Sequence, residues 1–210
     1  MKWQDYKLYY SEEQTMPSPV KINYKVYQGS TFRETFRWES STRGYANISA
    51  ISKAAPCVVT TATAHQIPLG WRAKVTGVLG MKEINSDEYR LVTDKTSTSV
   101  TFNEINAANY SQYLSGGVLE WNVPISLIGF TGRMQIRPAL DSTTIIKELT
   151  SANGGILIDT SLNTITVEMI ASDTQSFTFN TAVYSLELVR GSEVVPFVTG
   201  NLTLVKEITR

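Results

Sequence analysis

The feature that most constrains the fold of this chain is a small β unit nested inside the pattern of another domain. Residues 48–117 contain short apolar runs separated by turn residues, which is typical of several short strands. The segments on either side look like two halves of a second domain. The sequence therefore predicts an insertion: an N-terminal arm over residues 1–19, a sandwich domain over residues 20–46 and 122–210, and a small β unit over residues 47–121.

Alternating apolar and polar residues mark a strand of the sandwich before the insertion. Phe32, Phe36 and Trp38 have one parity, while Arg33 and Arg37 have the other. Successive side chains of a strand point to opposite faces, so the segment predicts a half-buried strand with outward arginines.

A second segment, beyond the insertion, repeats this alternation. Met134 and Ile136 form its apolar face, and Arg133 and Arg137 lie on its polar face. In the first segment, Glu34 interrupts the apolar face, which indicates a bulge or a sheet edge at that position.

The rest of the second half predicts further short strands. Residues 156–159 and 164–170 are rich in β-branched residues and form a hairpin pattern. Residues 141–150 favour a loop with a short strand or one helical turn, and residues 172–175 favour a helical turn capped by Ser172. Short strands at this spacing are typical of an antiparallel sandwich, so the predicted fold class is all-β.

Two sets of motifs resemble known families. The first set consists of residues 51–60, 64–70, 73–85 and 110–117. The second set consists of residues 124–138, 153–156 and 182–189. The first set resembles a small β-barrel module of bacteriophage structural proteins, related to the first catalytic-cysteine half-domain of ubiquitin-activating enzymes. The second set is similar to the Ig-like sandwich domain of phage tail and baseplate proteins.

These resemblances imply a non-enzymatic structural protein of a bacteriophage virion, located in the tail, baseplate or neck. Its partners would be other virion proteins, and copies of the chain would form a symmetric ring that supports attachment of other tail components. Arg and aromatic side chains most often anchor protein interfaces. The interface candidates are therefore Trp3, Tyr6, Tyr9 and Tyr10 in the arm and Arg33, Arg37, Arg133 and Arg137 on the strands.

Two other virion roles remain open. One is a receptor- or glycan-binding accessory that touches the host surface through loops of the barrel, with contact candidates Trp71, Arg72, Met81 and Tyr89. Aromatic faces can stack on sugars, although the same residues also fill β cores. The other is a head-decoration protein, because decoration proteins are also small β modules.

Composition argues against several partners. The 19 basic and 19 acidic residues give zero formal charge without a basic block, which argues against a nucleic-acid surface. No apolar stretch reaches the roughly 20 residues of a membrane helix, and the first residues lack the layout of a signal peptide. A single cysteine cannot form an internal disulfide. We therefore expect synthesis in the host cytoplasm, no membrane contact and no nucleic-acid partner.

Residue types suited to catalysis or metal binding are few. His65 is the only histidine, and no Gly-x-Ser-x-Gly motif supplies a nucleophile. A Cys57–His65 pair is the catalytic alternative; a buried Cys and a turn-capping His are the simpler interpretation. Glu83, Asp87 and Glu88 lie close together in sequence but lack the spacing of a calcium loop. We therefore expect no enzyme activity, no cofactor and no metal.

Overall fold

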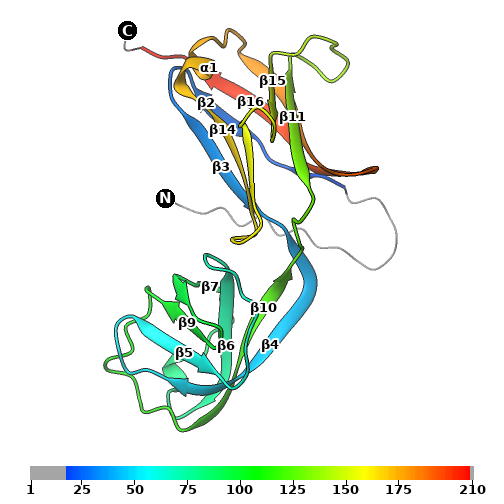
Figure 1. Ribbon diagram of the computed structural model, residues 1–210. Helices are drawn as coiled ribbons and strands as arrows, with labels where there is room; N and C mark the ends of the chain where they lie inside the picture. Colours follow the sequence, from blue (N-terminus) through cyan, green and yellow to red (C-terminus); the bar gives the residue numbers. More distant parts are fainter. Residues whose placement is uncertain (1–17, 209–210) are drawn as a thin grey trace. The chain divides into compact units, whose positions relative to one another are not determined.

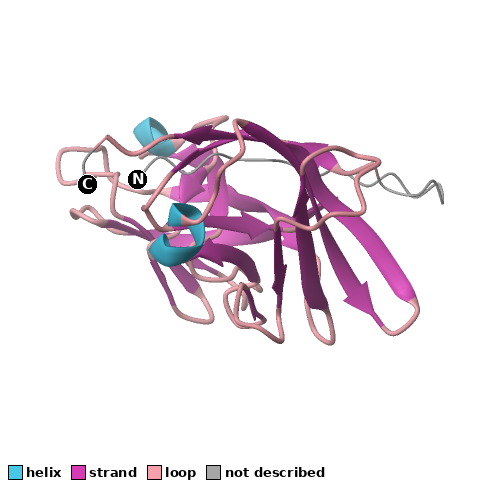
Figure 2. Ribbon diagram, turned by 90° about the horizontal axis from the view of Figure 1, so that it is seen from above, coloured by secondary structure: helices cyan, strands magenta, loops and turns pink. Residues whose placement is uncertain are grey.

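The computed structural model describes residues 18–208, and these consist almost entirely of β-strands and their connections. The helices in this part of the chain are α1 (Ala171–Gln175) and the single-turn 3-10 helix η1 (Lys82–Ile84), both short in Figure 2. Neither helix is long and apolar enough to cross a membrane. The predicted all-β fold class is confirmed.

The chain forms two compact units (Figure 1). Of the described residues, the first unit contains 18–38 and 126–208 and is therefore discontinuous, while the second unit contains Glu39–Ile125. These boundaries differ from the predicted ones, which were after residues 46 and 121. The reason is that β4 (Glu39–Ile51) and β10 (Ser115–Pro124) are long paired strands, and both belong to the second unit.

The first unit is a sandwich of two sheets. The larger sheet has the order β1-β16-β15-β11-β12, and β2 also pairs with β16. Its strands are β1 (Val20–Lys21), β2 (Tyr24–Tyr27), β11 (Thr131–Arg137), β12 (Lys147–Thr150), β15 (Thr181–Arg190) and β16 (Glu193–Val205). The smaller sheet has the order β13-β14-β3. Its strands are β3 (Phe32–Arg37), β13 (Ile156–Asp159) and β14 (Thr164–Met169).

The chain crosses between the two sheets of the sandwich several times. β1 and β2 pair in parallel with β16, the last strand, while the other pairings in the two sheets are antiparallel. The chain passes to the smaller sheet at β3, returns to the larger sheet at β11 and crosses again at β13. The predicted sandwich is confirmed, except that β1 and β2 pair in parallel with β16 where an antiparallel sandwich was expected, and the second unit is inserted between β3 and β11.

Aromatic rings from both sheets meet in the sandwich core. Phe36 of β3 packs edge-on against Phe197 of β16 with ring centroids 6.0 Å apart, and Trp38 packs against the same ring at 5.7 Å. All three rings are buried; the alternation in the first segment predicts this for Phe36 and Trp38, while Phe32, on the same face, is half-buried. Glu34 lies on this inward face, and β3 is an edge strand that pairs with β14 without a bulge. Of the two predicted explanations for Glu34, the sheet edge is correct.

A close main-chain contact holds the start of the sandwich to its last strand. The hydroxyl of Tyr184 donates a hydrogen bond of 2.9 Å to the carbonyl of Ile22, between β1 and β2. A Cβ at position 200 would overlap that same carbonyl oxygen, so this position requires Gly200. Asn201 N donates to Asn23 Oδ1 at 2.9 Å. These contacts fix the first strands beside β16.

Most of the local predictions in the second half are confirmed. The hairpin is β13 and β14, with Asn163 at φ 55° in its turn, and the short strand is β12. The helical turn is α1, but Ser172 is not its cap. Ile170 occupies the N-cap position without a side-chain hydrogen bond, because α1 begins one residue before Ser172.

The second unit is a seven-stranded sheet of order β7-β6-β10-β4-β5-β9-β8 that curls into a half-barrel (Figure 1). Its remaining strands are β5 (Cys57–Thr61), β6 (Arg72–Leu79), β7 (Arg90–Leu91), β8 (Asp94–Lys95) and β9 (Ser99–Phe102). Trp71, Phe102 and Leu119 are among the fully buried side chains of its core. The indole ring of Trp121 packs directly on Gly44 of β4, where a Cβ would overlap the ring.

Candidate functional site

The outer face of the larger sandwich sheet presents a groove lined by charged and polar side chains. β11 directs Met134 and Ile136 into the core and Arg133, Gln135 and Arg137 outward. The groove lies over β11, β12, β15 and β16 and has a volume of about 490 Å³. Its lining includes Arg133, Gln135, Arg137, Leu140, Glu148 and Glu187.

Each outward side chain of β11 has a partner that fixes its orientation. Arg133 Nε donates to Glu187 Oε2 of β15 at 2.6 Å, and Gln135 Nε2 donates to Glu148 Oε1 of β12 at 2.7 Å. Arg137 Nη2 donates to Gln135 Oε1 at 2.6 Å. The groove therefore has a row of oriented donors and acceptors in which two arginines and two glutamates balance.

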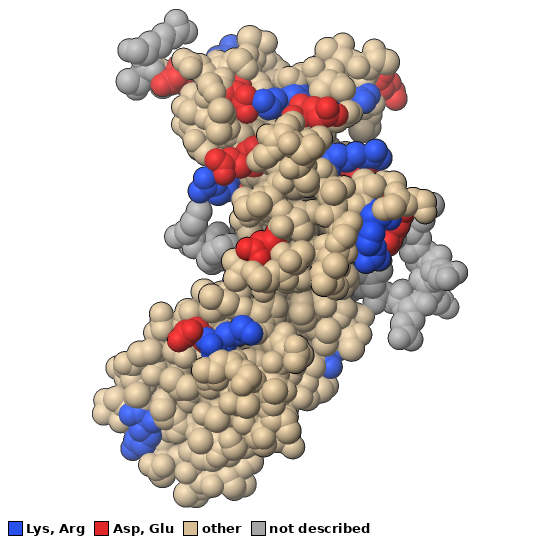
Figure 3. All heavy atoms as spheres, in the orientation of Figure 1, with Lys and Arg blue, Asp and Glu red and all other residues tan. Residues whose placement is uncertain are grey.

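This row remains accessible to solvent. The Arg133 side chain is 56% exposed, and Leu140 at the rim is 82% exposed. Side chains of opposite charge also lie next to one another on the face of the sandwich seen in Figure 3. An exposed, balanced row of this kind suits contact with a protein surface that offers complementary charges.

The four arginines predicted as interface residues lie on two different faces. Arg33 and Arg37 are on the outer face of the smaller sheet, opposite Glu168 and Thr164 of β14. Arg33 Nε donates to Glu168 Oε2 at 2.7 Å, and this bond holds the pKa of the Glu168 carboxyl below its usual value. The arm candidates lie outside the described residues: Trp3, Tyr6, Tyr9 and Tyr10.

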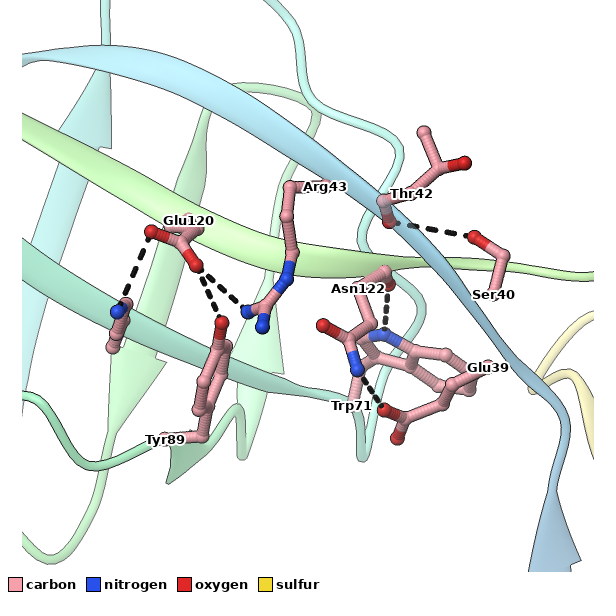
Figure 4. Close-up of polar contacts among 9 residues, drawn as sticks. Glu39, Ser40, Thr42, Arg43, Trp71, Tyr89, Glu120 and Asn122 are labelled. Atoms are coloured by element: carbon pink, nitrogen blue, oxygen red, sulfur yellow. Dashed lines mark hydrogen bonds and ion pairs between the residues drawn. The ribbon is translucent and has the colours of Figure 1, made fainter. Parts of the chain in front are cut away.

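Two of the four host-contact candidates in the barrel are wrong. Trp71 and Met81 are fully buried, so neither can touch another molecule. Trp71 Nε1 donates to the carbonyl of Asn122 at 2.8 Å, which fixes the indole inside the barrel (Figure 4). Arg72 and Tyr89 are half-buried and keep part of their surface exposed.

Tyr89 belongs to a polar cluster on the outer face of β4, β6 and β10 (Figure 4). Its hydroxyl donates to Glu120 Oε1 at 2.5 Å, and Arg43 Nη1 donates to the same oxygen at 2.7 Å. Lys74 Nζ lies 3.5 Å from the other carboxylate oxygen of Glu120. Arg43 and Lys74 both lie 5.4 Å from the centre of the Tyr89 ring, within cation–π range.

Of this cluster, sequence reasoning found Tyr89 alone. Glu120 lies directly opposite Tyr45 of β4 on one side and Lys74 of β6 on the other. That neighbourhood depends on the register of three strands, which the sequence does not reveal. The available signal was parity: Leu119 is buried in the core, and Glu120, the next residue, must face outward.

Cys57 and His65 both lie in the barrel core with main-chain partners. His65 Nδ1 accepts from the Ile67 amide at 3.3 Å, so Nε2 carries the proton and donates to the Ser99 carbonyl at 3.0 Å. Burial lowers the pKa of this imidazole and raises the pKa of the Cys57 thiol. Cys57 lies opposite Phe102 on β9, whereas His65 reaches the other end of that strand at Ser99. His65 therefore anchors the loop after β5.

The carboxylates considered for calcium do not converge. Glu83 Oε1 accepts from both the amide and the hydroxyl of Ser111 at 2.8 Å. Hydrogen bonding to its own backbone amide, and then these two bonds from Ser111, lower the pKa of the Glu83 carboxyl. Across residues 18–208, no group of three or more His, Cys, Asp or Glu side chains is placed to hold a metal ion.

No protein-family model matches this chain, and no curated protein matches it in sequence. Function is therefore inferred from its surfaces and from the motif resemblances.

Proposed function

We propose that this chain is a non-enzymatic structural protein of a bacteriophage virion, a component of the tail, baseplate or neck. Its sandwich docks with other copies in a symmetric ring that supports the attachment of other tail components. The main support is the groove on the outer face of β11, where Arg133 and Arg137 are oriented by their partners. The motifs that resemble phage modules supply the virion context.

The energetics of exposed ion pairs favour docking as the role of this groove. A solvent-exposed pair such as Arg133–Glu187 contributes only about 0–1 kcal/mol to folding. When a second protein covers the pair and excludes water, charge-assisted hydrogen bonds from the same arginine become stronger. In a closed ring every copy would bury this groove against the same surface of its neighbour.

The docking step is tested by measuring the mass of the full chain in solution. We expect the wild type to form a closed oligomer and the double variant Arg133→Gln, Arg137→Gln to be monomeric. The matched control is Arg33→Gln: this proposal assigns docking to the groove and not to the interface candidates of the smaller sheet, so loss of this equally exposed arginine should leave the oligomer intact. A monomeric wild type, or an oligomer that survives the double substitution, contradicts docking through this groove.

The virion location needs its own experiment. Gold-labelled antibody against the chain, applied to intact particles of the source phage, should mark the tail, baseplate or neck in electron micrographs. Particles without label contradict the virion proposal even if the purified chain forms rings.

A further inference from the structure

The polar cluster of the barrel is part of a row of outward side chains. Tyr45, Glu120 and Lys74 lie directly opposite one another on β4, β10 and β6, and Arg43 is the preceding outward residue of β4. Tyr45 is 62% exposed, so much of its side chain remains available to another molecule. The row thus places an exposed aromatic ring beside two cations.

Glu120 holds these two cations in place. Its side chain is only 15% exposed, and its oxygens are bonded by Arg43, Tyr89 and Lys74. Two cations against one carboxylate leave the cluster with one net positive charge. The fixed geometry reduces the conformational freedom that Arg43 and Lys74 would lose on binding an anion.

Arg43 keeps donors for a further ligand. Among the described residues its hydrogen bond is made through Nη1, which leaves the edge formed by Nε and Nη2 for another acceptor. That edge has the spacing of the two oxygens of a carboxylate and can bind them side by side. Lys74, at 3.5 Å from Glu120, has further ammonium protons for the same anion.

We propose that this face of the barrel binds an acidic polysaccharide. The carboxylate of a hexuronic acid residue binds the free edge of Arg43 and the ammonium of Lys74, and the apolar face of a neighbouring sugar ring packs on Tyr45. Nucleic acid fits less well, because the cluster offers two cations, Arg43 and Lys74, and a phosphate backbone needs many. This inference does not depend on the proposed virion role.

The test is calorimetric titration of the full chain with short oligogalacturonate and oligoglucuronate at low salt. The methyl esters of the same oligomers are the matched neutral ligands. We expect binding of the acidic oligomers, no detectable binding of the esters, and weakening with added salt. Arg43→Gln should weaken binding roughly tenfold, as expected for the loss of one charge-assisted hydrogen-bond pair. Arg33→Gln, which removes the same charge from the sandwich, should bind like the wild type.

Tyr45→Ala keeps the proposal testable if Arg43→Gln disturbs the barrel, because an exposed ring can be removed without opening the core. It should also weaken binding severalfold while leaving the circular dichroism spectrum unchanged. Absence of binding by the wild type overturns the proposal. Folded Tyr45→Ala and Arg43→Gln variants that both bind as tightly as the wild type also overturn it. Duplex DNA that binds as tightly as the oligomers at the same salt would also overturn it, since the face would then be a general polyanion surface.

Discussion

At the scale of single residues, the stability of the barrel depends on a neutral histidine. Burial lowers the pKa of His65, and its neutral form satisfies Ile67 and Ser99. A histidine whose pKa is lower in the folded chain stabilises the fold fully above the ordinary value of about 6.5, and this contribution is lost as the pH falls because the unfolded chain binds the proton first. We expect the unfolding free energy of the barrel to decrease from about pH 6.5 downward.

Urea unfolding at a series of pH values, followed by tryptophan fluorescence, measures this dependence. The chain has no other histidine, so His65→Gln should remove most of the slope near pH 6. The same variant should cost roughly 1–3 kcal/mol at neutral pH because a buried main-chain group loses its partner. A slope that persists in the variant would assign the titration to another group.

At the scale of the element, the edge strand β3 carries an inward-facing carboxylate, Glu34. Burial raises the pKa of this inward carboxyl, so its charged form weakens the fold at neutral pH, and the cost disappears as the pH falls through the raised pKa. We expect Glu34→Gln to raise the melting temperature at pH 7 and to have little effect near pH 4. Equal melting temperatures of Glu34→Gln and the wild type at pH 7 would argue against the burial effect.

An inward charge also blocks strand addition at the edge of a sheet. We therefore expect Glu34→Val to increase self-association, measured by sedimentation.

The strands were predictable where one face is buried and the other solvated. Phe36 and Arg37, or Met134 and Arg133, identify such a strand by parity alone. Trp71 was misassigned because Gly70 and Arg72 beside it look like a loop, whereas its indole is buried and bonded to Asn122, far away in sequence.

The polar cluster around Glu120 was missed for a related reason. Its members come together through the pairing register of β4, β6 and β10, and each looks like an ordinary outward residue in its own strand. Parity fixes the face of a side chain but not its neighbours across the sheet.

At the scale of the whole molecule, the geometry of the inserted unit explains why a sandwich can contain it. Glu39 and Pro124 are paired across β4 and β10, so the two ends of the insertion lie side by side. Paired Cα atoms are about 5 Å apart, which keeps Trp38 and Ser126 close enough for a short turn to join them. We therefore expect both units to fold separately: residues 39–125 alone, and the sandwich with a short glycine-rich linker in place of them.

Differential scanning calorimetry of the full chain should then show two transitions, each matched by one of the isolated parts. Excision at residues 47–121 is the informative control, because it cuts through β4 and removes the end of β10, which leaves only the Val118–Asn47 pair of their pairing in the fragment. That shorter fragment should fail to give a cooperative transition. If instead residues 39–125 fail to fold while the full chain melts in one step, the two units depend on each other, and the insertion is not an independent domain.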